Sequence, residues 1–336
     1  MKDKIFHFFG NIIEQTAVPT TIKLAIASRL DLFLFFLNQF THSYLKTTAE
    51  SRISEDFMKY VYTNNIDENP KKIGILKKGL DLESRNLIEQ IIQRQKHVFT
   101  HNILDLRLLT REERKDQHIY IYPIKRKYRR LGNYYGIENF YFHCGLRFLT
   151  KNVLKKYQKK DVVDAGAANG DTPAIFSREY TFKNIFAFEP EKNNYRKLLK
   201  NIKRFRLKNV IPVNKGVGDR NLVLKITNEE GQSHINVHGN QEVEIITIDE
   251  FVEKNNISVG LIKMDIEGFE SYAIKGAEET IKDQKPLLLI SIYHSGKDFF
   301  EIKPLLEKWG GYKFMVRKLN PHHFFFDTML ICTPVL

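Results

Sequence analysis

The sequence predicts an α/β fold in which an open, mostly parallel sheet of about seven strands follows a mainly helical N-terminal region. Three observations support this prediction. From residue 161 onward, short apolar runs alternate with amphipathic segments, and glycine or acidic residues follow many of the runs. Before that point, apolar residues recur three and four apart, as in helices. With 336 residues, 42% of them hydrophobic, the chain can bury a large core.

The expected elements of the C-terminal half follow one another as strand, turn and helix. A valine-rich strand at 162–166 leads through a glycine-containing turn into a helix at 172–180. Strands that are joined through a helix run parallel, whereas the last two strands are expected to be antiparallel neighbours. The remaining elements are expected as strand 185–188, helix 193–205, strand 210–213, a hairpin of 222–226 with 243–246, helix 248–254, strand 261–265, helix 269–281, strand 287–293, helix 300–309, and strands 312–316 and 324–332.

The chain divides into three expected regions. Residues 1–115 form a mainly helical part, 116–160 a basic and aromatic-rich connecting segment, and 161–336 the sheet domain. Within the first part, the spacing predicts helices at 22–40 and 81–95, with a linker at 64–72. The apolar first 45 residues are expected to pack on their own region, and the alternative is contact with a membrane surface or a partner subunit.

The net charge of +13 comes entirely from the N-terminal half, where residues 1–160 hold 29 Lys and Arg against 16 Asp and Glu. Such a charge attracts anions. It fits either a solvated surface or contact with a phosphate-bearing substrate, anionic lipid or nucleic acid. Tyrosines and phenylalanines near the basic residues are typical of sites that hold sugars, and also of sites that hold single-stranded RNA. The basic residues concentrate at Lys125, Arg126, Lys127, Arg129, Arg130, Lys151, Lys155, Lys156, Lys159 and Lys160.

No apolar run reaches the roughly 20 residues that a membrane-spanning helix needs. The two cysteines, Cys144 and Cys332, are too far apart in sequence for a zinc ribbon or a disulfide framework. A reducing, cytoplasmic location is therefore expected, with peripheral membrane contact as an alternative.

Polar side chains follow several of the predicted strands, where ligands bind in an open parallel sheet. The glycine turn lacks the third glycine of a dinucleotide motif, and no Gly-Lys-Ser/Thr follows the strand, so a phosphate loop is excluded. Asp164 can pair with a cation, and Glu189 is placed to accept hydrogen bonds from a ribose diol. A ligand with an ammonium group and a ribose but no phosphate satisfies both acids, which predicts S-adenosylmethionine.

Three stretches of this half resemble the FkbM family of S-adenosylmethionine-dependent methyltransferases. They are Asp164-Ala165-Gly166-Ala167-Ala168-Asn169-Gly170-Asp171, Phe188-Glu189-Pro190, and Lys263-Met264-Asp265-Ile266-Glu267-Gly268-Phe269-Glu270. The resemblance covers roughly residues 160–333. It implies a Rossmann-like class I methyltransferase sheet of seven strands, and commonly O-methylation of sugars, polyketides or glycan precursors.

The expected cofactor-binding residues surround the ends of the first, second and fourth parallel strands. Asn169 and Asp171 could instead cap the helix that follows them, and Asp219 could be an ordinary turn residue. The full expected set is Asp164, Gly166, Ala167, Asn169, Gly170, Asp171, Glu189, Pro190, Asp219 and Asp265.

The expected catalytic residues are Asp265, His294 and Glu267. Asp265 can accept the proton of an acceptor hydroxyl, or can bind a divalent ion such as magnesium together with Glu267. His294 follows a strand and is the natural base for a sugar hydroxyl, with an idle loop histidine as the alternative. Glu267 and Glu270 also lie where a helix dipole favours acids. No metal cluster of His and Cys is expected.

The sequence therefore predicts an O-methyltransferase that acts on a hydroxyl of a sugar, glycan or lipid-linked saccharide. The expected partners are that acceptor, which can carry phosphate, and a second copy of the chain, while nucleic acid is not expected. The alternatives are an RNA methyltransferase, which the charge favours and the lack of an Asn/Asp-Pro-Pro-Tyr motif opposes, and a non-catalytic binding protein that keeps the fold.

Overall fold

The computed structural model describes residues 43–45, 48–66, 71–101, 103–115, 118–128, 136–229, 232–235 and 241–335. The predicted helix at 22–40, most of the apolar first 45 residues, and the basic residues Arg129 and Arg130 lie outside these ranges.

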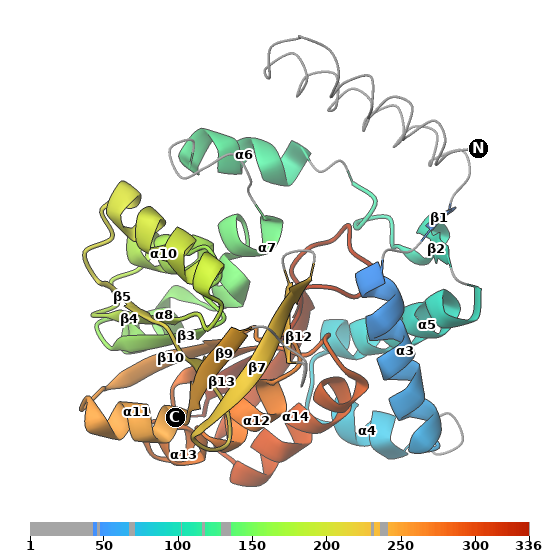
Figure 1. Cartoon of the computed structure of the whole chain (residues 1–336). Coiled ribbons are helices and arrows are strands. Elements are labelled where there is room, and N and C mark those ends of the chain that lie inside the picture. The colour runs from blue at the N-terminus through green and yellow to red at the C-terminus, as the bar shows by residue number, and fades with distance from the viewer. Residues whose placement is uncertain are drawn as a thin grey trace.

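A seven-stranded sheet forms the centre of the protein (Figure 1). Six strands run in one direction, and β13 is antiparallel to both of its neighbours. This arrangement confirms the predicted fold class. The strands lie in the order β12 (Tyr312–Lys318), β13 (Thr328–Pro334), β11 (Leu287–Ser291), β10 (Val259–Met264), β3 (Asp161–Ala165), β4 (Ile185–Phe188) and β5 (Val210–Val213).

Both faces of the sheet are covered, so its central strands are buried at every position. Successive residues of a strand point to opposite faces, and accordingly Val162 and Val163 belong to two different hydrophobic clusters. The covering helices of the C-terminal half are α9 (Asp171–Glu179), α10 (Lys192–Phe205), α11 (Ile248–Lys254), α12 (Glu270–Lys275), α13 (Glu278–Gln284) and α14 (Gly296–Trp309).

The strand order reverses between β3 and β10. The chain continues from β3 to β4 and β5 on one side, and from β10 to β11 on the other. In sheets of this type the carboxyl ends of the strands at the reversal form the ligand site, because the loops that follow them diverge there.

The structure corrects three predicted elements. Strand β7 (Leu222–Glu229) pairs antiparallel with β9 (Gln241–Ile246), as expected for the predicted hairpin of 222–226 with 243–246. An extra strand, β8 (Gln232–Ile235), lies between them in sequence and pairs with the other edge of β7. The predicted helix at 269–281 is two helices separated at Gly276, where a Cβ atom would lie 1.9 Å from the carbonyl oxygen of Gly218. The last strand begins at Thr328 instead of 324. The small second sheet contains β6 (Gly216–Val217), β9 (Gln241–Ile246), β7 (Leu222–Glu229) and β8 (Gln232–Ile235).

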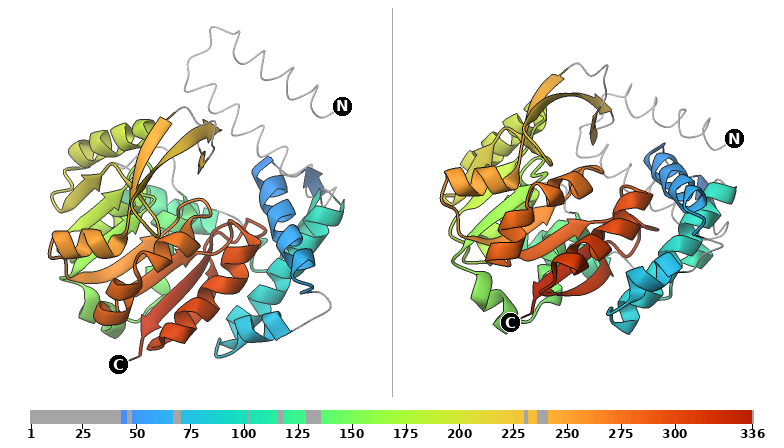
Figure 2. Two further views of the ribbon diagram at one scale, coloured as in Figure 1. Left: turned by 60° about the horizontal axis from the view of Figure 1, so that its bottom comes forward. Right: turned by 90° about the horizontal axis from the view of Figure 1, so that it is seen from below.

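The N-terminal helices pack directly on the sheet domain (Figure 2). Helices α3 (Thr48–Thr63) and α4 (Lys71–Lys77) lie against α14, and α5 (Leu82–His101) lies against β12. The ring of Phe57 is 5.2 Å from that of Phe299, and Tyr60 stacks on Phe300 at 5.7 Å. Apolar residues of these helices therefore belong to the same hydrophobic cluster as one face of the sheet. Two short strands, β1 (Ser43–Leu45) and β2 (Ile103–Asp105), pair beside them.

The connecting segment contains the short helices α6 (His118–Tyr128), α7 (Ile137–Phe140) and α8 (Lys151–Tyr157), with a 3-10 stretch η2 (His143–Phe148). Because α8 leads directly into the start of β3, its exposed lysines lie at the amino edge of the sheet, opposite the reversal site. Lys127 pairs with Glu179, the last residue of α9, which also runs away from that site. These basic residues thus lie away from the predicted ligand-binding edge.

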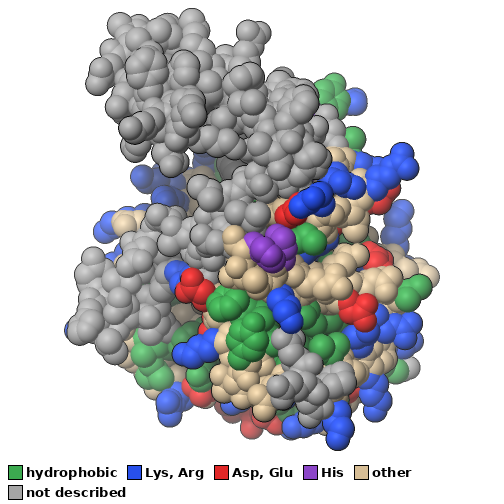
Figure 3. All heavy atoms as spheres, turned by 90° about the vertical axis from the view of Figure 1, so that its right-hand side faces the viewer, with side chains coloured by type: hydrophobic (Ala, Val, Ile, Leu, Met, Phe, Trp, Pro, Cys, Tyr) green, Lys and Arg blue, Asp and Glu red, His purple; other side chains and the backbone are tan. Residues whose placement is uncertain are grey.

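Figure 3 shows the side of the molecule formed by the N-terminal helices. Lys and Arg side chains are distributed there among acidic and hydrophobic ones, rather than gathered in one basic patch. None of the described helices combines the length and apolar character needed to cross a bilayer. Both cysteines are free and buried.

If the N-terminal helices and the sheet form one core, Phe57→Ala should lower the free energy of unfolding by about 3–5 kcal/mol, the usual cost of truncating a buried phenylalanine. Urea denaturation followed by circular dichroism measures this. The exposed Lys59→Ala on the same helix is the control, with less than about 0.5 kcal/mol expected. If Phe57→Ala also lowered the free energy of unfolding by less than about 0.5 kcal/mol, the shared core would be contradicted.

Candidate functional site

The loop after β3 touches the end of β10. Gly166 has φ +80°, and a Cβ atom on it would lie 1.9 Å from the carbonyl oxygen of Asp265. Only glycine permits both the backbone conformation and this close approach. The Asp265 N–H donates to the carbonyl of Ala165 at 3.1 Å. The glycine loop and Asp265, which are separated by about 100 residues, are therefore brought into contact as predicted.

Glu189, at the end of β4, joins the same loop. Its two carboxylate oxygens accept hydrogen bonds from the N–H of Ala168 at 2.8 Å and of Glu191 at 2.9 Å. Burial raises the pKa of Glu189 to about 7. The carboxylate thus already shapes the loop, and its remaining lone pairs are available to a ligand.

Asp164 and Lys263 form a fully buried ion pair between β3 and β10, with 3.2 Å between Oδ1 and Nζ. Burial alone lowers the pKa of Lys263, but the negative charges of Asp164 and Asp265 outweigh it and raise the pKa overall. Nζ of Lys263 also donates to the carbonyl of Gly166 at 2.9 Å. Asp164 therefore positions the glycine loop indirectly, because it holds the Lys263 side chain that binds the Gly166 carbonyl.

The other predicted cofactor residues lie around this loop. Oδ1 of Asn169 accepts from the N–H of Asp171 at 3.3 Å, whereas the N-cap position of α9 is Gly170 and has no side-chain cap. Burial raises the pKa of Asp171 to about 6. The Pro190 carbonyl accepts from Gln241 at 3.0 Å. Asp219 is exposed, and the side-chain contact found for it within the described residues is with Arg220, at 3.9 Å.

A second group of side chains is held together by Glu270, which the sequence did not single out as a site residue. Its carboxylate accepts from the N–H of Ile266 at 2.8 Å and of Gly268 at 3.0 Å, and from Nδ1 of His294 at 2.9 Å. Glu270 is fully buried. It therefore shapes the turn that carries Asp265 and Glu267 and fixes the orientation of the His294 ring.

His294 faces both predicted catalytic acids. Its Nε2 lies 3.6 Å from Oδ1 of Asp265 and 3.6 Å from Oε2 of Glu267. Tyr293 donates a long hydrogen bond to the same oxygen of Asp265 at 3.4 Å. The structure thus brings together the three residues predicted to be catalytic, and adds Tyr293 and Glu270 to them.

The charge around His294 determines its protonation. Burial by itself lowers the pKa of the imidazole, but Glu270, Glu267 and Asp265 outweigh this and raise it to about 10. At neutral pH the ring is then an imidazolium and cannot accept a proton from a substrate. Asp265 is the group in this cluster that remains half-exposed and adjacent to the loop after β3.

One atom each of Asp265, Glu270 and His294 lies within 4.8 Å of the others, a spacing that could hold a metal ion. However, the Glu270 carboxylate already accepts hydrogen bonds from Nδ1 of His294 and from two backbone amides. A proton on the imidazole accounts for this geometry without an ion. The alternative of a divalent ion on Asp265 and Glu267 remains a prediction.

Comparison with known proteins identifies the central part of the chain. Residues 164–314 match the family described as Methyltransferase FkbM domain. The hexuronic acid methyltransferase AglP of Haloferax volcanii is 28% identical over 162 residues, which cover 46% of this chain and 65% of that protein. The crystal structure of the methyltransferase FkbM from Methylobacillus flagellatus KT has a TM-score of 0.56 at 20% identity, covering 81% of this chain and 60% of that one. The chain spans less than two thirds of the length of either protein. At 20% identity, the similarity to the Methylobacillus flagellatus structure shows the fold alone.

The raised pKa of His294 predicts how stability depends on pH. The folded-state pKa of about 10 lies above the ordinary value near 6.5. The stabilisation that protonated His294 gives to the folded state is therefore complete below about pH 6.5, and it is lost as the pH rises to about 10. His294→Gln should therefore destabilise the protein more at pH 6 than at pH 10. Urea unfolding at both pH values measures this, and Glu270→Gln should make the pH dependence shallower. An equal loss at both pH values would show that His294 is not held as an imidazolium.

Proposed function

We propose that the chain transfers a methyl group from S-adenosylmethionine to a hydroxyl of a sugar, glycan or lipid-linked saccharide, because residues 164–314 match the Methyltransferase FkbM domain. The observation that carries this proposal is the meeting of the Gly166 loop, Glu189 and Asp265 at the reversal between β3 and β10. This combination of a glycine turn and acids suits a ribose and two positive charges, on nitrogen and sulfur, rather than a phosphate.

The residues around the loop have distinct proposed roles in holding the cofactor. Glu189 accepts hydrogen bonds from the ribose diol with the lone pairs that Ala168 and Glu191 leave unused. Asp171 and Asp265 place negative charge beside the loop, where it stabilises a cationic ligand. Asp164 contributes through Lys263, which holds the carbonyl of Gly166.

S-adenosylmethionine supplies, when bound, a methyl group that is already activated by its positively charged sulfur. The chain then has to align the acceptor oxygen and remove its proton. We propose that the carboxylate of Asp265 accepts the proton of the acceptor hydroxyl. His294 acts as the positively charged partner that orients the carboxylates of Asp265 and Glu267 at close range.

The support for a sugar acceptor is the similarity to the hexuronic acid methyltransferase AglP, which extends over 162 residues of the chain. The lysines of α8 are not part of this proposal because they lie at the opposite edge of the sheet.

Isothermal titration calorimetry with S-adenosylmethionine and S-adenosylhomocysteine tests the cofactor. We expect micromolar binding, about −8 kcal/mol. Glu189→Ala should weaken it at least tenfold, because a ribose acceptor is lost and two backbone amides lose their partner. Glu244→Gln, an exposed acid of the second sheet, is the matched control. Absence of binding by the wild type would refute the cofactor assignment and favour a non-catalytic protein.

Replacement of the proposed proton acceptor tests the chemistry. Asp265→Asn should lower kcat at least 100-fold, the size typical of a lost general base, while the dissociation constant of S-adenosylhomocysteine changes less than tenfold. Transfer of a radiolabelled methyl group to a saccharide extract measures the rate. Wild-type activity is expected to survive EDTA; its loss and restoration by magnesium would instead support an ion on Asp265 and Glu267.

A further inference from the structure

A pocket of about 390 Å³ lies between the N-terminal helices and the sheet domain. One wall is formed by Tyr60 of α3 with Lys72 and Ile75 of α4, and the other wall by residues of α12 and α14. Figure 2 shows α3 and α4 beside α14. The volume falls within the roughly 300–1,000 Å³ that is usual for small-molecule sites. None of the residues assigned above to the cofactor or to proton transfer lines this pocket.

Four lysines give the pocket a strong positive charge. None of them forms an ion pair within the described part of the chain, whereas Lys303, on the buried side of α14, pairs with Glu307. Among the described lining residues one is acidic, Glu301, and its carboxylate accepts from the hydroxyl of Tyr60 at 2.6 Å. Because like charges repel, an anion that enters the pocket is stabilised by all of these ammonium groups. The four lysines are Lys72, Lys275, Lys297 and Lys308.

Lys72 is held in position by uncharged groups. Its Nζ donates to Oδ1 of Asn64 at 2.8 Å and to the hydroxyl of Tyr60 at 3.2 Å. The ammonium also lies 5.1 Å from the centre of the Tyr60 ring. These hydrogen bonds use two of its three N–H donors, and no carboxylate of the described residues neutralises its charge. Lys72 is therefore a positioned cation with a donor left for a ligand.

Part of the lining is apolar. Phe300 is buried and stacks on Tyr60, with 5.7 Å between the ring centroids. Ile75 is 49% exposed, although it is a large hydrophobic side chain, and Pro304 and Leu305 lie in the same lining. Covering this surface with an apolar group is favourable because it removes hydrocarbon from water. Ammonium groups beside an apolar wall suit a ligand that joins a phosphate to an apolar organic part.

The two walls meet in a close helix contact. A Cβ atom on Gly296, at the start of α14, would lie 2.5 Å from the Cβ of Tyr60. The N–H of Gly296 donates to the carboxylate of Asp56 on α3 at 3.0 Å. Since no side chain fits between α3 and α14 at this point, their spacing is fixed by the backbone.

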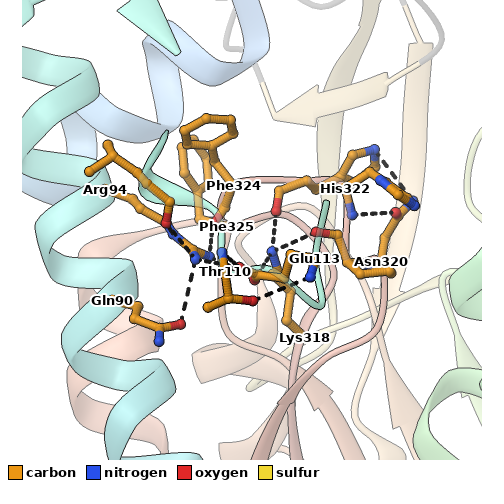
Figure 4. A network of polar contacts seen from close by, with 12 residues as sticks. Gln90, Arg94, Thr110, Glu113, Lys318, Asn320, His322, Phe324 and Phe325 are labelled. Carbon is orange, nitrogen blue, oxygen red and sulfur yellow. Dashed lines mark hydrogen bonds and ion pairs between the residues drawn. The ribbon is translucent and has the colours of Figure 1, made fainter. Parts of the chain in front are cut away.

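A buried charge network fixes the N-terminal helices to the sheet domain, as Figure 4 shows. Helix α5 packs against α3 and α4, and its Arg94 binds Glu113 through two nitrogens at 3.0 and 2.6 Å. The same guanidinium donates to the carbonyl of Phe324 at 3.1 Å, in the segment that joins β12 to β13. The pocket is therefore preformed, which lowers the entropy that a ligand loses on binding.

We propose that this pocket binds a phosphate or diphosphate ester whose organic part is apolar. The four lysines bind the phosphate oxygens, and Ile75, Pro304 and Leu305 pack against the organic part. A net charge of +3 among the lining residues matches a diphosphate better than a single carboxylate. Because the pocket shares no residue with the site at the reversal between β3 and β10, its ligand can bind whether or not methyl transfer takes place.

Isothermal titration calorimetry of the full chain with three probes tests the pocket. Geranyl diphosphate carries both parts of the proposed ligand, inorganic pyrophosphate only the charge, and geraniol only the apolar part. We expect geranyl diphosphate to bind about tenfold or more tightly than pyrophosphate, and geraniol to give no measurable binding. Higher ionic strength should weaken the binding of both anions.

Two pairs of lysine substitutions locate the binding. Lys275→Gln combined with Lys297→Gln changes two exposed residues of the pocket and should weaken geranyl diphosphate by about tenfold or more. Lys155→Gln combined with Lys156→Gln makes the same change in net charge on exposed residues of α8, and should change the affinity less than about twofold. Ile75→Ser should weaken geranyl diphosphate about threefold and leave pyrophosphate unchanged.

A lipid-linked saccharide and a free phosphate ester share this chemistry, and the methyl-transfer assay distinguishes them. Geranyl diphosphate raises the KM of the acceptor if the pocket holds the acceptor's own diphosphate, and leaves it unchanged if the ligand is a separate molecule.

The proposal is overturned if geranyl diphosphate does not bind, if both lysine pairs weaken it equally, or if pyrophosphate binds as tightly. S-adenosylhomocysteine should bind the Lys275–Lys297 variant as it binds the wild type, so failure of the cofactor assignment is detected separately.

Discussion

The direct contact between the ends of β3 and β10 is the constraint on which the candidate site depends. Gly166 approaches the Asp265 carbonyl so closely that no side chain fits between them. This contact places the loop that precedes α9 and the turn that precedes α12 against each other. Because β4 lies on the far side of β3, Glu189 can reach the same loop. One close backbone approach thus unites three segments that are distant in sequence.

The buried charges form two balanced groups around that contact. Lys263 compensates Asp164 within the sheet, and the imidazolium of His294 lies among Glu270, Glu267 and Asp265. A buried carboxylate without a cation would take up a proton rather than remain charged. The two cations therefore allow acids to persist in the interior.

The N-terminal helices belong to the same structural unit as the sheet domain. They share its hydrophobic cluster, and Asp56 of α3 accepts a hydrogen bond from the N–H of Gly296, two residues after His294. Arg94 reaches the β12–β13 loop from α5. Helices that sequence patterns assign to a separate region therefore support the β12–β13 loop and the start of α14.

The sequence alone determined the order of strands and helices in the sheet domain, because periodicity and turn residues are local properties. It also placed Asp164, Glu189, Asp265 and His294 within or directly after the ends of strands. Only the tertiary structure decided how these groups are paired. Glu270 looked like an ordinary first-turn acid, and its bond to His294 depends on the adjacency of β10 and β11. Burial and charge in the folded state set the protonation of His294, which no local pattern encodes.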